Sequence, residues 1–136
     1  MQLNPYLNFN GQCEEALKFY EKVLGGKITF SQTWGDSPMA QHVPPETHSR
    51  IRHSTLAVGE STLMCADSPP DRYEQPKGIH ITLNFKDTAE GERVFKELSE
   101  GGNIEMPFQP TFWSAGFGMC VDKFSIPWMV NCDQAD

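Results

Sequence analysis

The sequence has no run of basic residues, no long apolar stretch and no signal-like start, and each absence removes a class of protein. Its 136 residues carry a net charge of −7, and no Lys/Arg-rich stripe favours binding to a phosphate backbone or an anionic membrane. No apolar run approaches the roughly 20 residues of a membrane span, and residues 1–12 lack the basic and apolar regions of a secretory signal. We therefore expect a cytoplasmic protein that binds neither nucleic acid nor membrane.

Paired cysteines are also missing. The four cysteines form no C-x-x-C pair and no zinc-finger spacing, so we expect reduced and partly buried thiols. A hydrophobic fraction of 38% and an aromatic fraction of 11% are typical of a folded globular chain. The length suits one domain with a real core.

What the chain does contain is an internal repeat. The segment from Leu7 to Ile28 aligns without a gap on the segment from Leu83 to Ile104, at a constant offset of 76 residues (83 − 7 = 76). Both copies begin with Leu-Asn-Phe, carry Glu, Phe and Glu at matching positions, and contain Gly-Gly near the end. Such self-similarity indicates a duplicated supersecondary unit.

Each copy is predicted to form a strand, a helix and then three strands. Apolar residues recur with helical spacing near 12–24 and 88–100, and Gly25 and Gly101 fit the position that ends a helix. The later strands are expected at 27–34, 51–58, 62–66, 104–112, 117–121 and 127–132. The predicted fold class is α+β: two βαβββ modules, at about 4–66 and 79–132, joined by a Pro-rich linker at 67–77 within one domain of residues 1–136.

The first strand of each module has one unusually polar face. Because strand side chains alternate, Leu7 and Phe9, like Leu83 and Phe85, should lie under the helices, with the two phenylalanines as buried equivalents. The opposite faces consist of Asn4, Tyr6, Asn8, His80, Thr82 and Asn84. A first strand should lie inside its sheet, so a polar face there indicates either a sheet open to water or a wetted pocket lined by both modules.

Three runs of the sequence carry a family resemblance. They are NPYLNFNGQCEEALKFYEKVLGGKI from Asn4, HSTLAVG with LMCAD from His53, and TFWSAGFG followed by VDKFSIPWMVN from Thr111. These runs resemble the PhnB-like branch of the vicinal-oxygen-chelate (glyoxalase/bleomycin-resistance) superfamily. The resemblance implies paired βαβββ modules whose curved mixed sheets form a cup, often in a homodimer. Ser125 stands where that family usually has glycine.

The resemblance also bears on cofactors. Members are often labelled demethylubiquinone methyltransferases, but this sequence has no glycine-rich strand–turn–helix for S-adenosylmethionine. Metal-dependent relatives place His or Glu at four inward positions, which by analogy are Asn4, Met64, His80 and Met129 here. Only His80 is a good ligand, and two methionines favour soft cuprous ions. We therefore expect no cofactor, and a divalent metal held by other residues stays an open alternative.

Two functions remain as alternatives. One is metal-free binding of a small organic molecule in the cup. The other is a metal-dependent enzyme of the superfamily: a lyase, isomerase, dioxygenase or thiol transferase acting on a small metabolite or antibiotic. His80 is a candidate general base, whereas His53, within a strand, is expected to be a hydrogen-bonded histidine. The expected lining of the cup is Asn4, Tyr6, Asn8, His53, His80, Thr82, Trp113, Met129 and Asn131.

Overall fold

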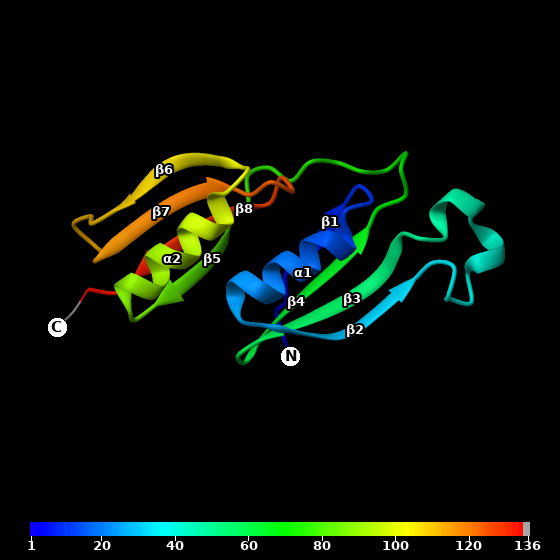
Figure 1. Cartoon of the computed structure of the whole chain (residues 1–136), viewed down its shortest axis with the longest axis horizontal. Coiled ribbons are helices and arrows are strands. Elements are labelled where there is room, and N and C mark those ends of the chain that lie inside the picture. Colours follow the sequence, from blue (N-terminus) through cyan, green and yellow to red (C-terminus); the bar gives the residue numbers. More distant parts are fainter. Residues whose placement is uncertain (135–136) are drawn as a thin grey trace. The chain divides into compact units, whose positions relative to one another are not determined.

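The computed structural model describes residues 1–134 of the chain. The chain divides between Glu74 and Gln75 into two compact units, each built from a strand, a helix and three further strands (Figure 1). Unit 1 consists of β1 (Tyr6–Phe9), α1 (Cys13–Leu24), β2 (Lys27–Thr33), β3 (Ile51–Val58) and β4 (Ser61–Asp67), with the short 3-10 helices η1 (Ala40–His42) and η2 (Pro45–Thr47) between β2 and β3. Unit 2 consists of β5 (Ile81–Phe85), α2 (Thr88–Ser99), β6 (Asn103–Gln109), β7 (Gly116–Val121) and β8 (Pro127–Cys132). The predicted βαβββ repeat is confirmed; residues 135–136 of the predicted domain lie outside the described residues.

Each unit holds one four-stranded mixed sheet. The strand orders are β1-β4-β3-β2 and β5-β8-β7-β6, and the first strand pairs in parallel with the last. The prediction that a first strand lies inside its sheet is wrong for the sheet of each unit, because β1 and β5 are edge strands. The helix carries the chain from the first strand to the far edge, and two hairpins then fold back until the last strand reaches the first.

The two helices each cover one face of a sheet. α1 packs on β2, β3 and β4 of unit 1, and α2 packs on all four strands of unit 2 (Figure 1). We call the opposite faces face 1, in unit 1, and face 2, in unit 2. No helix within residues 1–134 is long and apolar enough to span a bilayer.

The two glycines after each helix are required for different reasons, one by the backbone conformation and the other by a close contact. Gly25 and Gly101 have φ angles of 71° and 77°, in the left-handed region that side chains with a Cβ disfavour. A Cβ on Gly26 or Gly102 would instead lie 2.8 Å or 2.1 Å, respectively, from a carbonyl oxygen of the neighbouring strand. The first glycine of the pair turns the chain, and the second lets the next strand approach the sheet.

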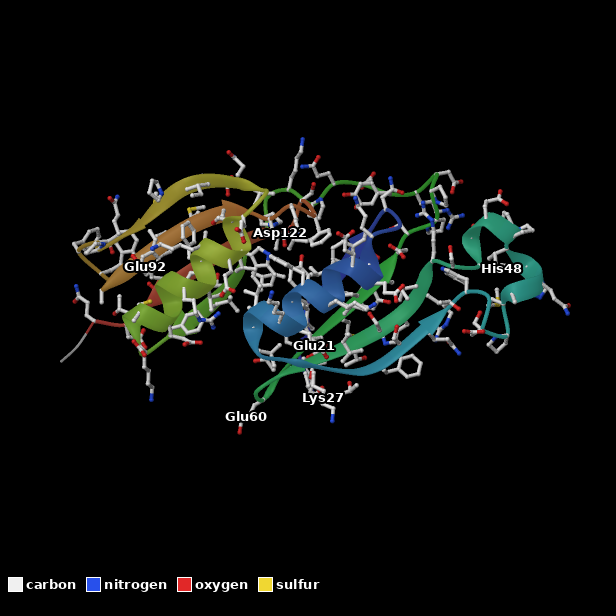
Figure 2. All side chains as sticks on the ribbon, viewed as in Figure 1. Glu21, Lys27, His48, Glu60, Glu92 and Asp122 are labelled. Carbon is white, nitrogen blue, oxygen red and sulfur yellow. The ribbon has the colours of Figure 1, made fainter. Side chains whose placement is uncertain are left out.

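Two buried carboxylates hold turns in place. Asp67, at the end of β4, accepts the backbone N–H groups of Gly11 at 2.8 Å and Cys13 at 3.0 Å. It thereby caps α1 from a distant strand, because the N-cap residue of that helix, Gln12, supplies no side-chain hydrogen bond. In unit 2, Asp122 (labelled in Figure 2) accepts the indole N–H of Trp128 at 2.8 Å and fixes that ring in the core.

The first strands face their helices as alternation predicts, but the two phenylalanines differ. Phe9 is 1% exposed and packs against Tyr20 of α1, with ring centroids 6.4 Å apart. Phe85 lies beside Gly91 of α2 and is only partly buried. The expectation of buried equivalents is therefore wrong, because the position that holds Tyr20 in the first repeat holds the exposed Lys96 in the second.

Candidate functional site

Face 1 is organised around a pair formed by a tyrosine and a histidine. The hydroxyl of Tyr6 on β1 lies 2.9 Å from Nδ1 of His53 on β3, and the two rings stack with centroids 5.6 Å apart. The ring of Phe30 on β2 lies 5.9 Å from the same imidazole. Burial raises the pKa of Tyr6, and the positive charge of Arg52 opposes part of that rise. His53 is thus a hydrogen-bonded histidine, as its place in a strand predicts.

The other two residues predicted for this face lie apart from the pair. Asn4 precedes β1, and its Nδ2 donates to Oε1 of Gln2 at 3.5 Å. Asn8 is exposed on β1 beside Ala66. No hydrogen bond within residues 1–134 links either asparagine to Tyr6.

Face 2 carries a carboxylate–imidazole pair. Nε2 of His80, just before β5, lies 3.2 Å from Oε1 of Glu105 on β6, and the two side chains are 22% and 40% exposed. Because β5 and β6 form opposite edges of the sheet of unit 2, this contact requires the sheet to curve strongly. No acidic partner for His80 was expected from the sequence.

A β-bulge brings the carboxylate to this position. The pairing of β6 with β7 shifts between Ile104 and Met106, so Glu105 is an extra residue in β6. The same shift occurs between Ile28 and Phe30, 76 residues earlier in the repeat (104 − 28 = 76). The repeat alone could have suggested that both copies share their irregularities, but the bulge itself depends on pairing that the local sequence does not reveal.

The middle and far end of face 2 combine apolar and amide side chains. Thr82 and Met129 are direct neighbours across the β5–β8 pair, and Nδ2 of Asn131 donates to Oδ1 of Asn84 at 3.2 Å. Oδ1 of Asn131 is buried, and no donor within residues 1–134 bonds to it. A buried acceptor without a donor is costly, so a bound N–H or O–H group that reached this oxygen by displacing its neighbours would relieve that cost.

An ordered aromatic loop adjoins the same end. Trp113 follows β6, and its ring lies 5.4 Å from that of Phe117, the register neighbour of Asn131. The hydroxyl of Thr111 accepts the backbone N–H groups of Trp113 at 3.3 Å and Ser114 at 3.1 Å, which fixes the loop. The indole of Trp113 therefore lies beside face 2, on a turn that the hydrogen bonds of Thr111 hold in place.

The residues at the four positions that the resemblance assigns to a metal include few ligands suited to a divalent ion. Met64 is the register neighbour of Tyr6, and Met129 is that of Thr82, so both last strands offer a thioether. His80 and Glu105 supply two donors, whereas catalytic zinc sites use three protein ligands. No group of three or more His, Cys, Asp or Glu side chains in the described part of the chain is placed to hold a metal ion.

Comparison with known proteins agrees with this architecture. The profile of the Glyoxalase/Bleomycin resistance protein/Dioxygenase superfamily matches residues 2–130. Protein YjdN of Escherichia coli (strain K12) is 35% identical over 141 residues, which cover 96% of this chain and 95% of YjdN. The crystal structure of protein PA1353 from Pseudomonas aeruginosa matches with a TM-score of 0.91 and 46% identity over 99% of both chains. The PhnB protein from Bacillus cereus matches with a TM-score of 0.82 and 22% identity, over 97% of this chain and 99% of that one, which supports the fold alone.

Proposed function

The chain is a member of the Glyoxalase/Bleomycin resistance protein/Dioxygenase superfamily, and from this premise we propose that it binds a small organic molecule on the open faces of its sheets without a metal. The lining on which this rests is Tyr6, Asn8 and His53 on face 1 and His80, Thr82, Trp113, Met129 and Asn131 on face 2, with Asn4 beside β1. The cup lined by both modules stays a prediction.

The buried oxygen of Asn131 is the observation that carries the proposal. No donor within residues 1–134 bonds to it, so a ligand N–H or O–H that reached it would remove a cost of about 1–3 kcal/mol. His80 and Glu105 offer a second polar contact. His80 lies four residues before Asn84, the register neighbour of Asn131, which corresponds to about 13 Å of extended chain. Met129 and Thr82 lie between these ends. The arrangement suits a molecule with an apolar body and polar groups at its ends.

Acid–base catalysis is a second candidate function, and the His80–Glu105 pair favours it. A carboxylate that holds one ring nitrogen fixes the orientation of the imidazole. The other nitrogen, Nδ1, would then exchange a proton with a bound molecule. This chemistry needs no metal, in contrast to the metal-dependent lyases, isomerases, dioxygenases and thiol transferases of the alternative function.

Binding can be tested with fragments that match face 2. Benzamide offers an amide N–H to Asn131, whereas toluene offers only the ring. We expect benzamide to raise the melting temperature of the wild-type protein more than toluene does, and Asn131→Leu to abolish that difference. Equal shifts from both fragments would refute the role of Asn131.

The metal-free character can be tested separately. His80→Ala should fold normally and weaken benzamide binding, while the control His42→Ala, at an exposed histidine of η1, should leave it unchanged. EDTA should alter neither melting temperature nor binding. Stoichiometric Zn²⁺, Ni²⁺ or Mn²⁺ in elemental analysis, or a lower melting temperature with EDTA, would favour the metal-dependent enzyme.

We also propose a homodimer in the cytoplasm. Each sheet ends in two edge strands whose unpaired backbone groups are available to a second copy. Light scattering should give twice the chain mass of 15.3 kDa at micromolar concentration, and a monomer mass would count against the proposal. Cell fractionation tests the location.

A further inference from the structure

Arg52 is an arginine that a β-bulge turns onto face 1. In the β2–β3 pair, Gln32 is the register neighbour of His53 and Thr33 that of Ile51, so Arg52 is an extra residue in β3. Burial shows the same break in alternation: Ile51 is buried, Arg52 and His53 are both partly exposed, and the next residue is buried again. A bulge of this kind re-aims a side chain, and here two successive residues share the face that carries Tyr6.

The guanidinium is held at one end and free at the other. Nε of Arg52 donates to Oε1 of Gln32 at 2.6 Å, and Nε2 of Gln32 donates to the carbonyl of Asp36 at 3.3 Å. No carboxylate or other acceptor within residues 1–134 meets the two terminal nitrogens. Arg93 on α2 differs, because it pairs with two glutamates of its own helix. Arg52 is therefore a partly buried, oriented cation without a counter-ion.

Tyr6 and Phe30 lie on face 1 with Arg52 and add a hydroxyl group and an apolar ring to its surroundings. Burial raises the pKa of Tyr6 and the nearby charge of Arg52 lowers it; the net change is upward, so the phenol is protonated at neutral pH, as in an ordinary tyrosine. The ring of Phe30 adds an apolar wall beside His53. A planar guanidinium presents two parallel N–H groups, the geometry that binds a carboxylate or phosphate in bidentate fashion.

We propose that face 1 binds the oxyanion, carboxylate or phosphate type, of a small ring-containing molecule, with Arg52 as its anchor and Tyr6 and Phe30 beside the ring. This inference rests on the proposed function only in placing a small molecule on an open face, and it names the chemical class of that molecule.

The test compares anions with a neutral molecule of the same ring. Benzoate, phenylphosphonate and inorganic phosphate are titrated at constant ionic strength into the wild type, Arg52→Met and Arg52→Lys, with benzamide as the uncharged ring. Arg93→Met is the control, because it removes the same charge from the exposed surface of α2. Amide and side-chain NMR shifts locate the binding, and circular dichroism melts check that each variant is folded.

We expect benzoate or phenylphosphonate to shift the signals of Tyr6, Gln32 and His53 and to bind at least about 10-fold more weakly to Arg52→Met, as loss of a charge-assisted pair implies. Arg52→Lys should retain part of the affinity, and Arg93→Met all of it.

The comparison of benzoate with the two phosphorus anions identifies the type of oxyanion, and binding of inorganic phosphate alone would overturn the role of the ring. Equal benzoate and phenylphosphonate binding by the wild type and folded Arg52 variants, or no shift at Tyr6 with up to millimolar anion, would overturn the proposal. Benzamide binding at Asn131 is read out separately, so failure at Arg52 and failure of the proposed function are distinguishable.

Discussion

Replacing Gly91 with alanine tests how α2 is seated on its sheet, which decides which side chains reach face 2. A Cβ at position 91 would lie 2.3 Å from Sγ of Cys132 and 3.3 Å from Cδ2 of Phe85. Cys132 is fully buried on β8, which is paired with β5 on one side and β7 on the other, so its sulfur has no free space to enter. Overpacking of this kind costs about 1–3 kcal/mol.

A second effect opposes the clash, and this makes the sign of the result informative. Alanine is favoured over glycine inside a helix by about 1 kcal/mol. We therefore expect Gly91→Ala to lower the free energy of unfolding by up to about 2 kcal/mol net. In a Cys132→Ala background, where the sulfur is gone, the same change should raise the free energy of unfolding by up to about 1 kcal/mol.

Urea unfolding of the four proteins, followed by circular dichroism at constant m-value, measures this cycle. Position 15 is the matched control, because Glu15 is the repeat counterpart of Gly91 and is exposed on α1 (91 − 15 = 76). The difference between alanine and glycine there gives the helix preference alone. If Gly91→Ala stabilises the wild type as much as that difference, α2 does not lie on β8 as described, and the assignment of His80 and Thr82 to the opposite face fails.

Three further predictions concern stability. Ser125 has a φ of 73°, so Ser125→Gly should raise the free energy of unfolding by about 0.5–1 kcal/mol, and an unchanged urea midpoint would contradict the strain. Phe9→Ala should cost about 3–5 kcal/mol and Phe85→Ala clearly less, as measured by the same unfolding assay; equal losses would contradict the difference in burial. A hydrogen bond with the Cys13 thiol and burial raise the pKa of Cys65, so only the unfolded thiol ionises as the pH rises above its ordinary value. The free energy of unfolding should then fall by up to about 1.4 kcal/mol per pH unit above about pH 9, and Cys65→Ala, compared at pH 8 and pH 10, should lack this component.

The repeat and the helical spacing were sufficient to predict most of the fold. Helices expected near 12–24 and 88–100 form at Cys13–Leu24 and Thr88–Ser99, because apolar periodicity and a terminal Gly-Gly are local signals. The position of the first strands at the edge of each sheet was missed, since it follows from how the hairpins fold back and not from any segment alone. The second-copy strand expected to reach residue 112 ends at Gln109, just before a proline and the loop that carries Trp113.

The site was predicted less well, for a physical reason. Alternation along a strand identifies the faces of Tyr6 and Thr82, because the side-chain period is two. It fails for Arg52 and Glu105, where an extra residue shifts the pairing. Both residues are charged, so alternation alone misses one charged side chain on each face.

Comparison of the two copies of the repeat distinguishes the features that the fold requires from the residues that differ between face 1 and face 2. Both copies keep the Gly-Gly pair and the bulge 76 residues apart, because the close backbone approach and the strand curvature are needed twice. At the bulge itself the copies differ: Thr29 stands in unit 1 where Glu105 stands in unit 2. Asn4 likewise stands where His80 does. The carboxylate–imidazole pair is therefore a feature of unit 2 that the repeat does not share, and we propose for it a role in binding or proton transfer.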